Sequence, residues 1–178
     1  MSWRAPAAPA LAAALATALA APAQAGPFED READWRNGAI VYQVIVDRFA
    51  PSARLADKRA LYPAPKRLRG WDEQPAAGPY LEEHRLSAHE LDFWGGDLES
   101  TRERLGHVQR LGATVLYLNP IHLAWTNHKY DAFDYQAVSP EYGSREDFRR
   151  LAAEAQDRKS TRLNSSHSQL VCRLLLEI

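Results

Sequence analysis

The sequence has 178 residues, of which 46% are hydrophobic and 25% are charged, and its formal net charge is −1. A chain of this length forms at most one domain of ordinary size. The charge balance argues against nucleic acid and against an anionic membrane surface as partners. The histidines and acids show no metal-ligand spacing of the HExxH kind, so the sequence predicts no metal site of that type.

Residues 1–25 are predicted to be a secretory signal peptide rather than part of the fold. Arg4 is the only charged residue in this stretch, an alanine- and leucine-rich run follows from Ala7 to Ala21, and Ala23-Gln24-Ala25 is a small-x-small cleavage site. The alternative is an alanine-rich helix or a membrane anchor, but the apolar run is too short to span a bilayer. We therefore expect an exported protein, periplasmic or extracellular, without a membrane partner.

The first strand is predicted at Ala39 to Val46, where AIVYQVIV is apolar and rich in β-branched residues. A long connection follows from Ala50 to Asp92. Its prolines, at positions 51, 63, 65, 75 and 79, exclude long regular helices between them. Connections of this length in compact domains tend to be functional or mobile.

A helix with both ends marked is predicted after this connection. Asp97 is a good N-cap, because its carboxylate can accept hydrogen bonds from the first unpaired amides. Gly112 can supply the left-handed residue that ends the helix. Between these ends an apolar face recurs at helical spacing, formed by Leu98, Leu105, Val108 and Leu111.

A strand and a second helix complete the pattern. Thr114 to Leu118 (TVLYL) predicts a strand that is buried on both faces, and Pro120 prevents it from continuing. The second helix is expected from about Arg145 to Gln156, because Ser144 and Asp147 form a capping pair before an apolar face. That face consists of Phe148, Leu151, Ala152 and Ala155. The order strand, helix, strand, helix predicts an α/β fold with a parallel sheet.

Four segments carry a resemblance: VYQVIVDRF, FWGGDLESTRERLGHVQRLGATVLYLNPI, NHKYDAFDY and SREDFRRLAAEA. In this order and spacing they resemble the opening of glycoside hydrolase family 13, the α-amylase family, and its neopullulanase and cyclomaltodextrinase branch in particular. The resemblance covers Ile40 to about Gln156, apart from a divergent segment at Ala50 to Asp92. It implies that residues 26–156 are the N-terminal portion of a (β/α)8 TIM barrel, incomplete because only two strands and two helices are present.

The resemblance also implies a retaining glycosidase or transglycosidase that acts on α-glucosidic bonds of maltodextrin-like glucans. Such enzymes need two carboxylates about 5 Å apart, and the family carries them after strands that are absent here. We therefore assign no catalytic residue and expect the chain as given to be inactive. Two alternatives stay open: a non-catalytic barrel that binds glucan or a partner, and a rearrangement such as sugar isomerisation on the same barrel.

By the same resemblance, Tyr130 would stack under the sugar ring next to the scissile bond, and His128 would hydrogen-bond a hydroxyl of that sugar. An aromatic face matches the C–H face of a pyranose, and an imidazole can donate or accept a hydrogen bond. The alternative is that both side chains are buried and hold their loop against the barrel. Asp131 and Asp134 are expected to fix the loop conformation rather than to do chemistry.

Other residues near the predicted active face have a functional and a structural interpretation. Asp47, Arg48 and Phe49 follow the first strand, where a β/α barrel carries its binding groups. Alternatively, Asp47 and Arg48 pair and tie their loop to neighbouring strands. In the long connection, three side chains would either line a sugar-binding cleft or anchor the loop: Trp71, Tyr80 and His84.

A structural calcium ion is the one metal that the resemblance raises. Some family members hold it with oxygens at the positions of Gly95 and Asp97, and with Asp and Asn residues just after the first strand. Calcium takes about six to eight oxygen ligands. This chain has residues 50–54 (APSAR) after the strand, with Asp57 as the only nearby acid. We therefore expect no calcium and no other cofactor, and the expected partner is an α-glucan oligosaccharide.

The last segment, Asp157 to Ile178, breaks the pattern, because no third strand is predicted where a barrel requires one. Asp157 to His167 matches, codon by codon, the translation of a widely used sequencing-library adapter, and Leu170 to Glu177 matches its continuation in a second frame. We interpret residues 157–178 as adapter-derived rather than native; the alternative is an amphipathic helix at Leu170 to Leu176. No site is built on Cys172, the only cysteine.

Overall fold

The computed structural model describes residues 31, 34, 37–158 and 162–165. The chain divides into two compact units, Met1–Asn37 and Gly38–Ile178, and the second carries every element discussed below. The predicted signal peptide and most of the predicted adapter-derived segment lie outside the described residues. Within the described part, no helix combines the length and the hydropathy that crossing a membrane requires.

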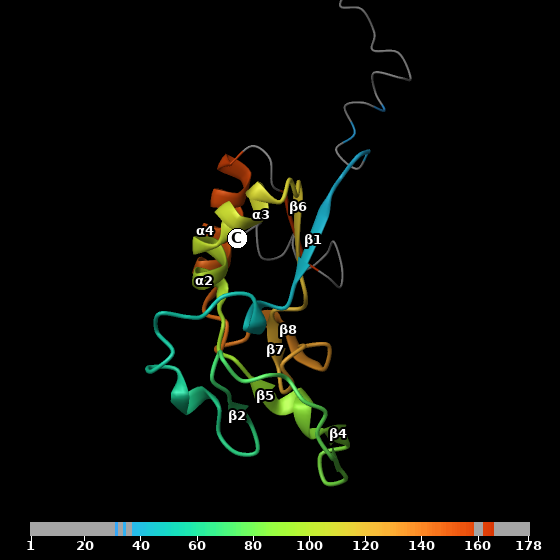
Figure 1. The fold of residues 1–178 in the computed structure, drawn as a ribbon, viewed down its shortest axis with the longest axis vertical. Helices are drawn as coiled ribbons and strands as arrows, with labels where there is room; N and C mark the ends of the chain where they lie inside the picture. The colour runs from blue at the N-terminus through green and yellow to red at the C-terminus, as the bar shows by residue number, and fades with distance from the viewer. Residues whose placement is uncertain (1–30, 32–33, 35–36, 159–161, 166–178) are drawn as a thin grey trace, which may run out of the picture. The chain divides into compact units, whose positions relative to one another are not determined.

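A parallel sheet lies in the second unit (Figure 1). β1 (Val41–Val44) pairs in parallel with β6 (Val115–Leu118), and β6 pairs in parallel with β9 (Arg162–Ser165). The predicted parallel arrangement of the first two strands is therefore confirmed. β1 is shorter than the predicted strand, because the 3-10 turn η1 (Val46–Arg48) begins where the strand was expected to end.

The third strand shows that the prediction of no strand after the second helix was wrong. β9 lies next to β6 in the order β1-β6-β9, so the described sheet has three parallel strands rather than two. The free edge of β6 presents backbone N–H and C=O groups that any extended segment can satisfy. Backbone pairing of this kind needs no particular side chains, so an adapter-derived sequence and a native one would pair alike.

The helix predicted between Asp97 and Gly112 is divided into two. α2 spans Leu98–Glu103 and α3 spans Leu105–Arg110, with a break at Arg104. At the break, Arg104 has φ −96° and ψ 5°, which departs from the regular helix. The sequence pattern carries no signal for this break.

Both predicted helix ends are confirmed. The Asp97 carboxylate accepts a hydrogen bond from Ser100 N at 2.8 Å, and Asp97 N donates to Ser100 Oγ at 3.0 Å. Gly112 has a φ of 74°, and Ala113 N donates to Val108 O at 3.3 Å, which is the closing bond of a Schellman ending. Local capping chemistry therefore defines the two ends that the sequence marked.

The predicted apolar face is confirmed except at Leu111. Leu98, Leu105 and Val108 are fully buried, whereas Leu111 is 53% exposed. At about 100° per residue, Leu111, the C-cap of α3, lies about 120° around that helix from the buried Leu105, which turns it away from the core.

α4 spans Arg145–Asp157, one residue longer than predicted, and its capping pair is confirmed. Ser144 N donates to the Asp147 carboxylate at 2.7 Å, and Asp147 N donates to Ser144 Oγ at 3.2 Å. With α2 and α3, this helix covers one side of β1 and β6 (Figure 1). The core between them consists of Val44, Val46, Leu98, Leu105, Val108, Ala113, Leu116, Leu118, Ile121, Tyr142, Phe148, Leu151 and Ala155.

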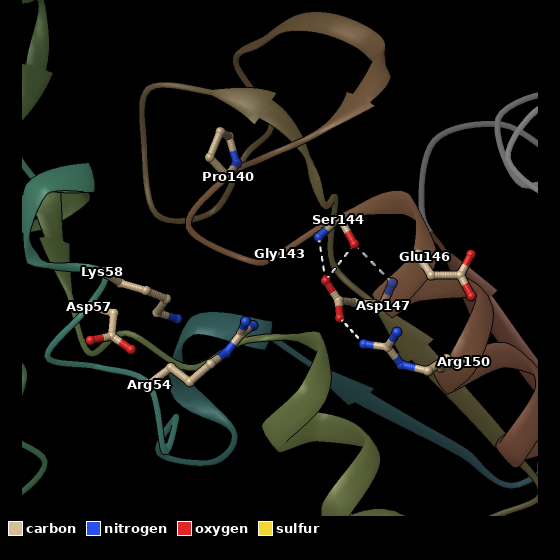
Figure 2. Close-up of a pocket in the computed structure, with 9 residues that line it drawn as sticks. All are labelled: Arg54, Asp57, Lys58, Pro140, Gly143, Ser144, Glu146, Asp147 and Arg150. Atoms are coloured by element: carbon tan, nitrogen blue, oxygen red, sulfur yellow. Dashed lines mark hydrogen bonds and ion pairs between the residues drawn. The ribbon is translucent and has the colours of Figure 1, made fainter.

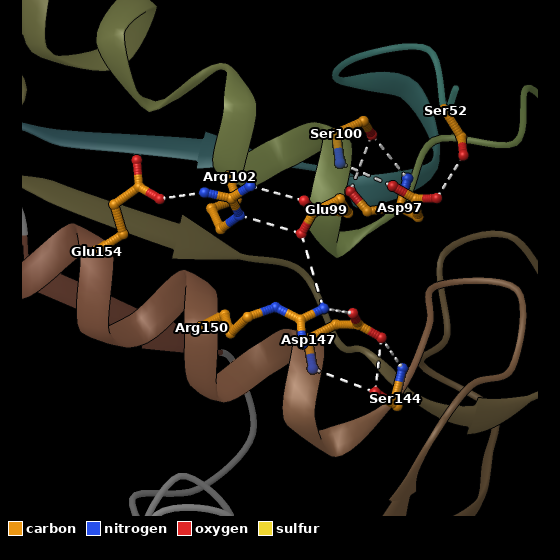
Figure 3. Close-up of polar contacts among 9 residues, drawn as sticks. All are labelled: Ser52, Asp97, Glu99, Ser100, Arg102, Ser144, Asp147, Arg150 and Glu154. Carbon is orange, nitrogen blue, oxygen red and sulfur yellow. Dashed lines mark hydrogen bonds and ion pairs between the residues drawn. The ribbon is translucent and has the colours of Figure 1, made fainter. Parts of the chain in front are cut away.

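Ion pairs join α2 to α4 (Figure 3). Arg102 of α2 lies 2.6 Å from Glu99 on its own helix and also contacts Glu154 of α4. Arg150 of α4 lies 3.9 Å from Glu99. These side chains are partly exposed, so each pair contributes at most about 1 kcal/mol, and the buried apolar faces dominate the packing of the two helices.

The connections after β1 and β6 form small sheets of their own. β7 (His122–Ala124) and β8 (Ala132–Val138) form an antiparallel hairpin after β6. Within the long connection, β2 (Arg67–Leu68) pairs in parallel with β5 (Asp92–Phe93). The same connection also contains the antiparallel pair β3 (Tyr80–Leu81) and β4 (Leu86–Ser87) and the 3-10 turns η2 (Arg59–Leu61) and η3 (Ala88–Leu91).

Candidate functional site

The residues predicted to contact sugar lie in the turn between β7 and β8. Asn127, which is buried, fixes this turn to the end of the long connection: its side-chain amide donates to His89 O at 2.8 Å and to Asp92 O at 2.9 Å. Asn127 N donates to Glu90 O at 2.9 Å, and Tyr142 Oη donates to Asn127 O at 2.7 Å. The position of the turn is therefore set by two distant segments of the chain.

The half-buried ring of His128 is oriented through both of its nitrogens. Tyr130 N donates to His128 Nδ1 at 3.1 Å, so in the neutral imidazole Nδ1 is the acceptor and Nε2 carries the proton. Nε2 lies 3.1 Å from Glu90 Oε2 and donates to it. A hydrogen bond from Ser87 N, assisted by His128, holds the pKa of Glu90 below its usual value.

Sequence reasoning missed Glu90 as a partner of His128. Glu90 closes the capping box of η3, in which its carboxylate accepts a hydrogen bond from Ser87 N at 2.8 Å. The S-x-x-E spacing is visible in the sequence, and it predicts a helix start. It does not point to a histidine 38 positions further along the chain.

Lys129 and Tyr130 point in opposite directions from the same turn. Lys129 has a φ of 61° and a fully buried side chain, whereas Tyr130 is 46% exposed. Lys129 Nζ lies 3.4 Å from the Glu141 carboxylate and 5.1 Å from the centre of the Tyr142 ring. Burial lowers the pKa of Lys129 to about 8, and the Glu141 charge opposes this shift. The buried lysine anchors the turn and leaves Tyr130 exposed, with its ring 5.7 Å from that of His128.

Two further acids fix the same region, as predicted. The Asp131 carboxylate accepts hydrogen bonds from Trp125 N and Thr126 N, each at 3.1 Å. The Asp134 carboxylate accepts a hydrogen bond from Gln136 N at 2.7 Å. Both acids therefore stabilise the local backbone.

Asp47 joins the end of β1 to the segment before α2, which confirms the structural interpretation of this residue. Its fully buried carboxylate accepts hydrogen bonds from Trp94 N and Gly95 N, both at 2.9 Å. Burial raises the pKa of Asp47 to about 6, and these two hydrogen bonds oppose the shift. Arg48 lies 4.4 Å above the Trp94 ring. The expectation that Phe49 lies at the active face was wrong: the chain turns through η1, and Phe49 packs against the core.

Two pockets lie near these residues. One, of about 310 Å³, is bordered by Arg48, Asp92 and Trp94. The other, of about 540 Å³, lies at the N-terminus of α4 between Lys58 and Asp147 (Figure 2). Charged side chains of both signs line the second pocket, so it presents no single electrostatic preference.

The aromatic candidates of the long connection line neither pocket. Trp71 is 36% exposed, Tyr80 is 54% exposed and His84 is also exposed, so neither interpretation of these three residues is confirmed. Tyr62 takes the anchoring role, because its buried ring lies 5.2 Å from the buried ring of Phe93. The positions of the aromatic residues in the sequence did not show that Tyr62 is buried whereas Trp71 and Tyr80 are exposed.

The residues at the position where the family resemblance raises a calcium ion do not fit one. Lys58 Nζ donates to Gly95 O at 2.9 Å and to Asp97 Oδ2 at 3.1 Å, the two positions from which the family resemblance takes metal ligands. Ser52, from the segment expected to supply acids, donates to the same Asp97 oxygen. Among the residues that the structure describes, no group of three or more His, Cys, Asp or Glu side chains is placed to hold a metal.

Comparison with known proteins gives one family. Residues 43–161 match the family model described as alpha amylase, catalytic domain. Neopullulanase 2 of Thermoactinomyces vulgaris is 34% identical over 128 residues, covering 70% of this chain and 18% of that protein. An amylopullulanase of Thermoanaerobacterium saccharolyticum is 32% identical over 136 residues, covering 68% of this chain and 10% of that protein. The chain thus spans less than a fifth of the length of these relatives.

Two solved structures of glucan hydrolases are also similar to this chain in sequence and in fold. The cyclic α-maltosyl-(1→6)-maltose hydrolase of Arthrobacter globiformis is 33% identical with a TM-score of 0.57, covering 74% of this chain and 25% of that one. The type III pullulan hydrolase of Thermococcus kodakarensis is 26% identical with a TM-score of 0.57, covering 71% of this chain and 22% of that one.

Proposed function

This chain belongs to the family of α-amylase catalytic domains, and we propose that its parent protein is a retaining glycosidase or transglycosidase acting on α-glucosidic bonds of maltodextrin-like glucans. The predicted family and the incomplete (β/α)8 barrel are confirmed. The observation that carries the proposal is the pair formed by His128 and the exposed Tyr130 beyond the end of β6, inside the matched residues. The relatives described above carry names that refer to pullulan or to cyclic maltosyl-maltose, which supports an α-glucan substrate.

The geometry gives each residue of this pair a distinct role in our proposal. The exposed Tyr130 ring offers a flat apolar face on which a pyranose can stack. A sugar hydroxyl placed beside His128 can accept the Nε2 proton and donate to the Glu90 carboxylate, which stands 3.1 Å from that nitrogen. Glu90 would then favour a hydroxyl over an apolar group, because an apolar group at this position would leave an oxygen of its partly exposed carboxylate without a donor.

We further propose that the chain as given does not hydrolyse glucan. Retaining hydrolysis needs two free carboxylates about 5 Å apart. The acids that contact the turn are engaged in holding structure: Asp131 accepts from the backbone of Trp125 and Thr126, and Glu90 accepts from Ser87 N and His128. None of them is placed as half of a catalytic pair.

Our proposal also includes a longer, exported parent. β1 lies at an edge of the described sheet, in the order β1-β6-β9, although a strand in a closed barrel is paired on both sides. The small-x-small site at residues 23–25 supports export, and the adapter match supports a native chain that departs from this one at about Asp157.

The test is to read the gene past the codon for Gln156 from genomic DNA and to assay the completed enzyme for reducing sugar released from pullulan, starch and cyclodextrin. Stacking on an aromatic ring is worth about 1 kcal/mol, so Tyr130→Ala should lower activity at least about fivefold. Tyr130→Phe keeps the ring and should retain most activity, as should Tyr80→Ala, which removes an exposed tyrosine elsewhere.

Equal activity of the Ala and Phe variants at position 130 would refute the stacking role. Glucan hydrolysis by the purified 178-residue chain would refute the proposed inactivity, and a natural stop codon directly after Gln156 would refute the longer parent.

A further inference from the structure

Lys58 is a buried cation at a point where three distant segments meet. Its side chain is only 9% exposed and comes from the long connection, directly before η2. Nζ donates to Gly95 O at 2.9 Å, to Asp97 Oδ2 at 3.1 Å and to Glu141 O at 2.9 Å. An ammonium group has three N–H donors, so all three are satisfied by these oxygens.

We propose that Lys58 is a built-in substitute for a structural metal ion, and that this chain takes no calcium at the position where its family resemblance implies one. The ammonium joins the start of α2, the long connection and the segment that leads into α4, which is the kind of link that a bound ion provides. Figure 2 shows the side chain extending from the long connection beside that segment. The inference does not depend on the proposed enzymatic function.

The local charge suits a monovalent cation. Among the residues that the structure describes, Asp97 alone contacts Lys58 Nζ through a carboxylate, because Glu141 contributes its backbone carbonyl. The Glu141 carboxylate is paired elsewhere, with Lys66 and with Lys129. One carboxylate balances one ammonium, whereas calcium takes about six to eight oxygens at distances of about 2.3–2.6 Å and favours several carboxylates.

Neighbouring oxygens that could complete a metal shell already have partners. Asp97 Oδ1 accepts a hydrogen bond from Ser100 N at 2.8 Å, as Figure 3 shows, and Ser52 donates to Asp97 Oδ2. Both oxygens of Asp47 accept backbone hydrogen bonds. A calcium ion would have to displace the Lys58 ammonium and break several of these bonds.

The Gly95 backbone is shaped for this contact. Gly95 has a φ of 77°, and a Cβ at this position would lie 2.2 Å from Leu55 Cδ1. Glycine therefore allows the chain to turn tightly under Leu55 while its carbonyl accepts the hydrogen bond from Lys58. The lysine contact is thus part of a fixed backbone geometry rather than a mobile side chain on the surface.

Thermal unfolding of the 178-residue chain in excess EDTA and in excess calcium chloride, followed by circular dichroism, tests the inference. The wild type should unfold at the same midpoint in both solutions. Lys58→Met keeps an unbranched side chain but leaves Asp97 buried without its cation, so the midpoint should fall by roughly 6–20 °C. Arg59→Met changes the exposed neighbouring residue and should leave the midpoint within about 2 °C of the wild type.

Terbium luminescence gives a second measurement, since Trp94 adjoins Gly95 and would sensitise a lanthanide bound in place of calcium. We expect no sensitised emission from the wild type above that of the unfolded chain. A wild-type midpoint that rises in calcium, sensitised emission from the folded wild type, or an unchanged midpoint for Lys58→Met would each overturn the inference. If Lys58→Met fails to fold while Arg59→Met folds, the stability lost with the lysine exceeds the stability of the chain, and this result supports the inference.

Discussion

The buried carboxyl of Asp47 should make the free energy of unfolding depend on pH. It is fully buried, and burial raises its pKa to about 6 from a usual value of 3.8. A carboxyl whose pKa is higher in the folded protein binds more protons when folded than when unfolded. Between these two pKa values, acidification therefore adds stability through this group, and the contribution is absent at neutral pH.

The magnitude follows from the two pKa values. Lowering the pH from 7 to 4.5 should increase the contribution of Asp47 to the free energy of unfolding by about 2 kcal/mol, because most of the folded protein and little of the unfolded chain is then protonated at this site. Asp47→Asn removes the titration. The single side-chain oxygen of asparagine can accept a hydrogen bond from only one of the two amides, Trp94 N and Gly95 N. The lost hydrogen bond lowers the unfolding free energy by an amount that does not vary with pH.

The assay is urea unfolding of the wild type and of Asp47→Asn at both pH values. The difference in unfolding free energy between the two proteins should grow by about 2 kcal/mol in favour of the wild type at the lower pH. Other carboxylates titrate in both proteins and cancel in the subtraction. Asp72→Asn, at an exposed position, serves as the control. A difference for Asp47→Asn that stays constant with pH, or shrinks on acidification, would refute the reasoning.

Two matched pairs of substitutions test the packing by denaturant unfolding. Leu116→Ala, in the fully buried core, should lower the unfolding free energy by about 2–5 kcal/mol, whereas Leu111→Ala, at a half-exposed position, should change it by less than about 1 kcal/mol; similar losses would contradict the assigned core. Gly95→Ala should lower the unfolding free energy more than Gly112→Ala. Both glycines have positive φ, but the added Cβ lies 2.2 Å from Leu55 at Gly95 and has nothing within 4 Å at Gly112. Equal losses of unfolding free energy would show that the steric contact adds nothing to the backbone strain.

The sequence by itself determined the features whose physical cause is local. The Asp97 cap and the Ser144–Asp147 capping box depend on groups within one helical turn, and the left-handed ending at Gly112 depends on the absence of a side chain. The buried strand at Val115–Leu118 follows from a run of apolar residues long enough for a strand and too short for a helix. Such signals can be read from neighbouring residues, and the structure confirms them.

Only the tertiary structure decided which side chains act together at the site. Lys58 contacts the Glu141 backbone across 83 positions, Asp47 contacts Trp94 across 47, and His128 contacts Glu90 across 38. No periodicity or capping pattern encodes these contacts, because each depends on where the sheet and the long connection bring two segments together and on how far burial excludes water. The exposure of Tyr130 was decided in the same way: the neighbouring lysine is buried against residues from other segments, and that burial turns the tyrosine outward.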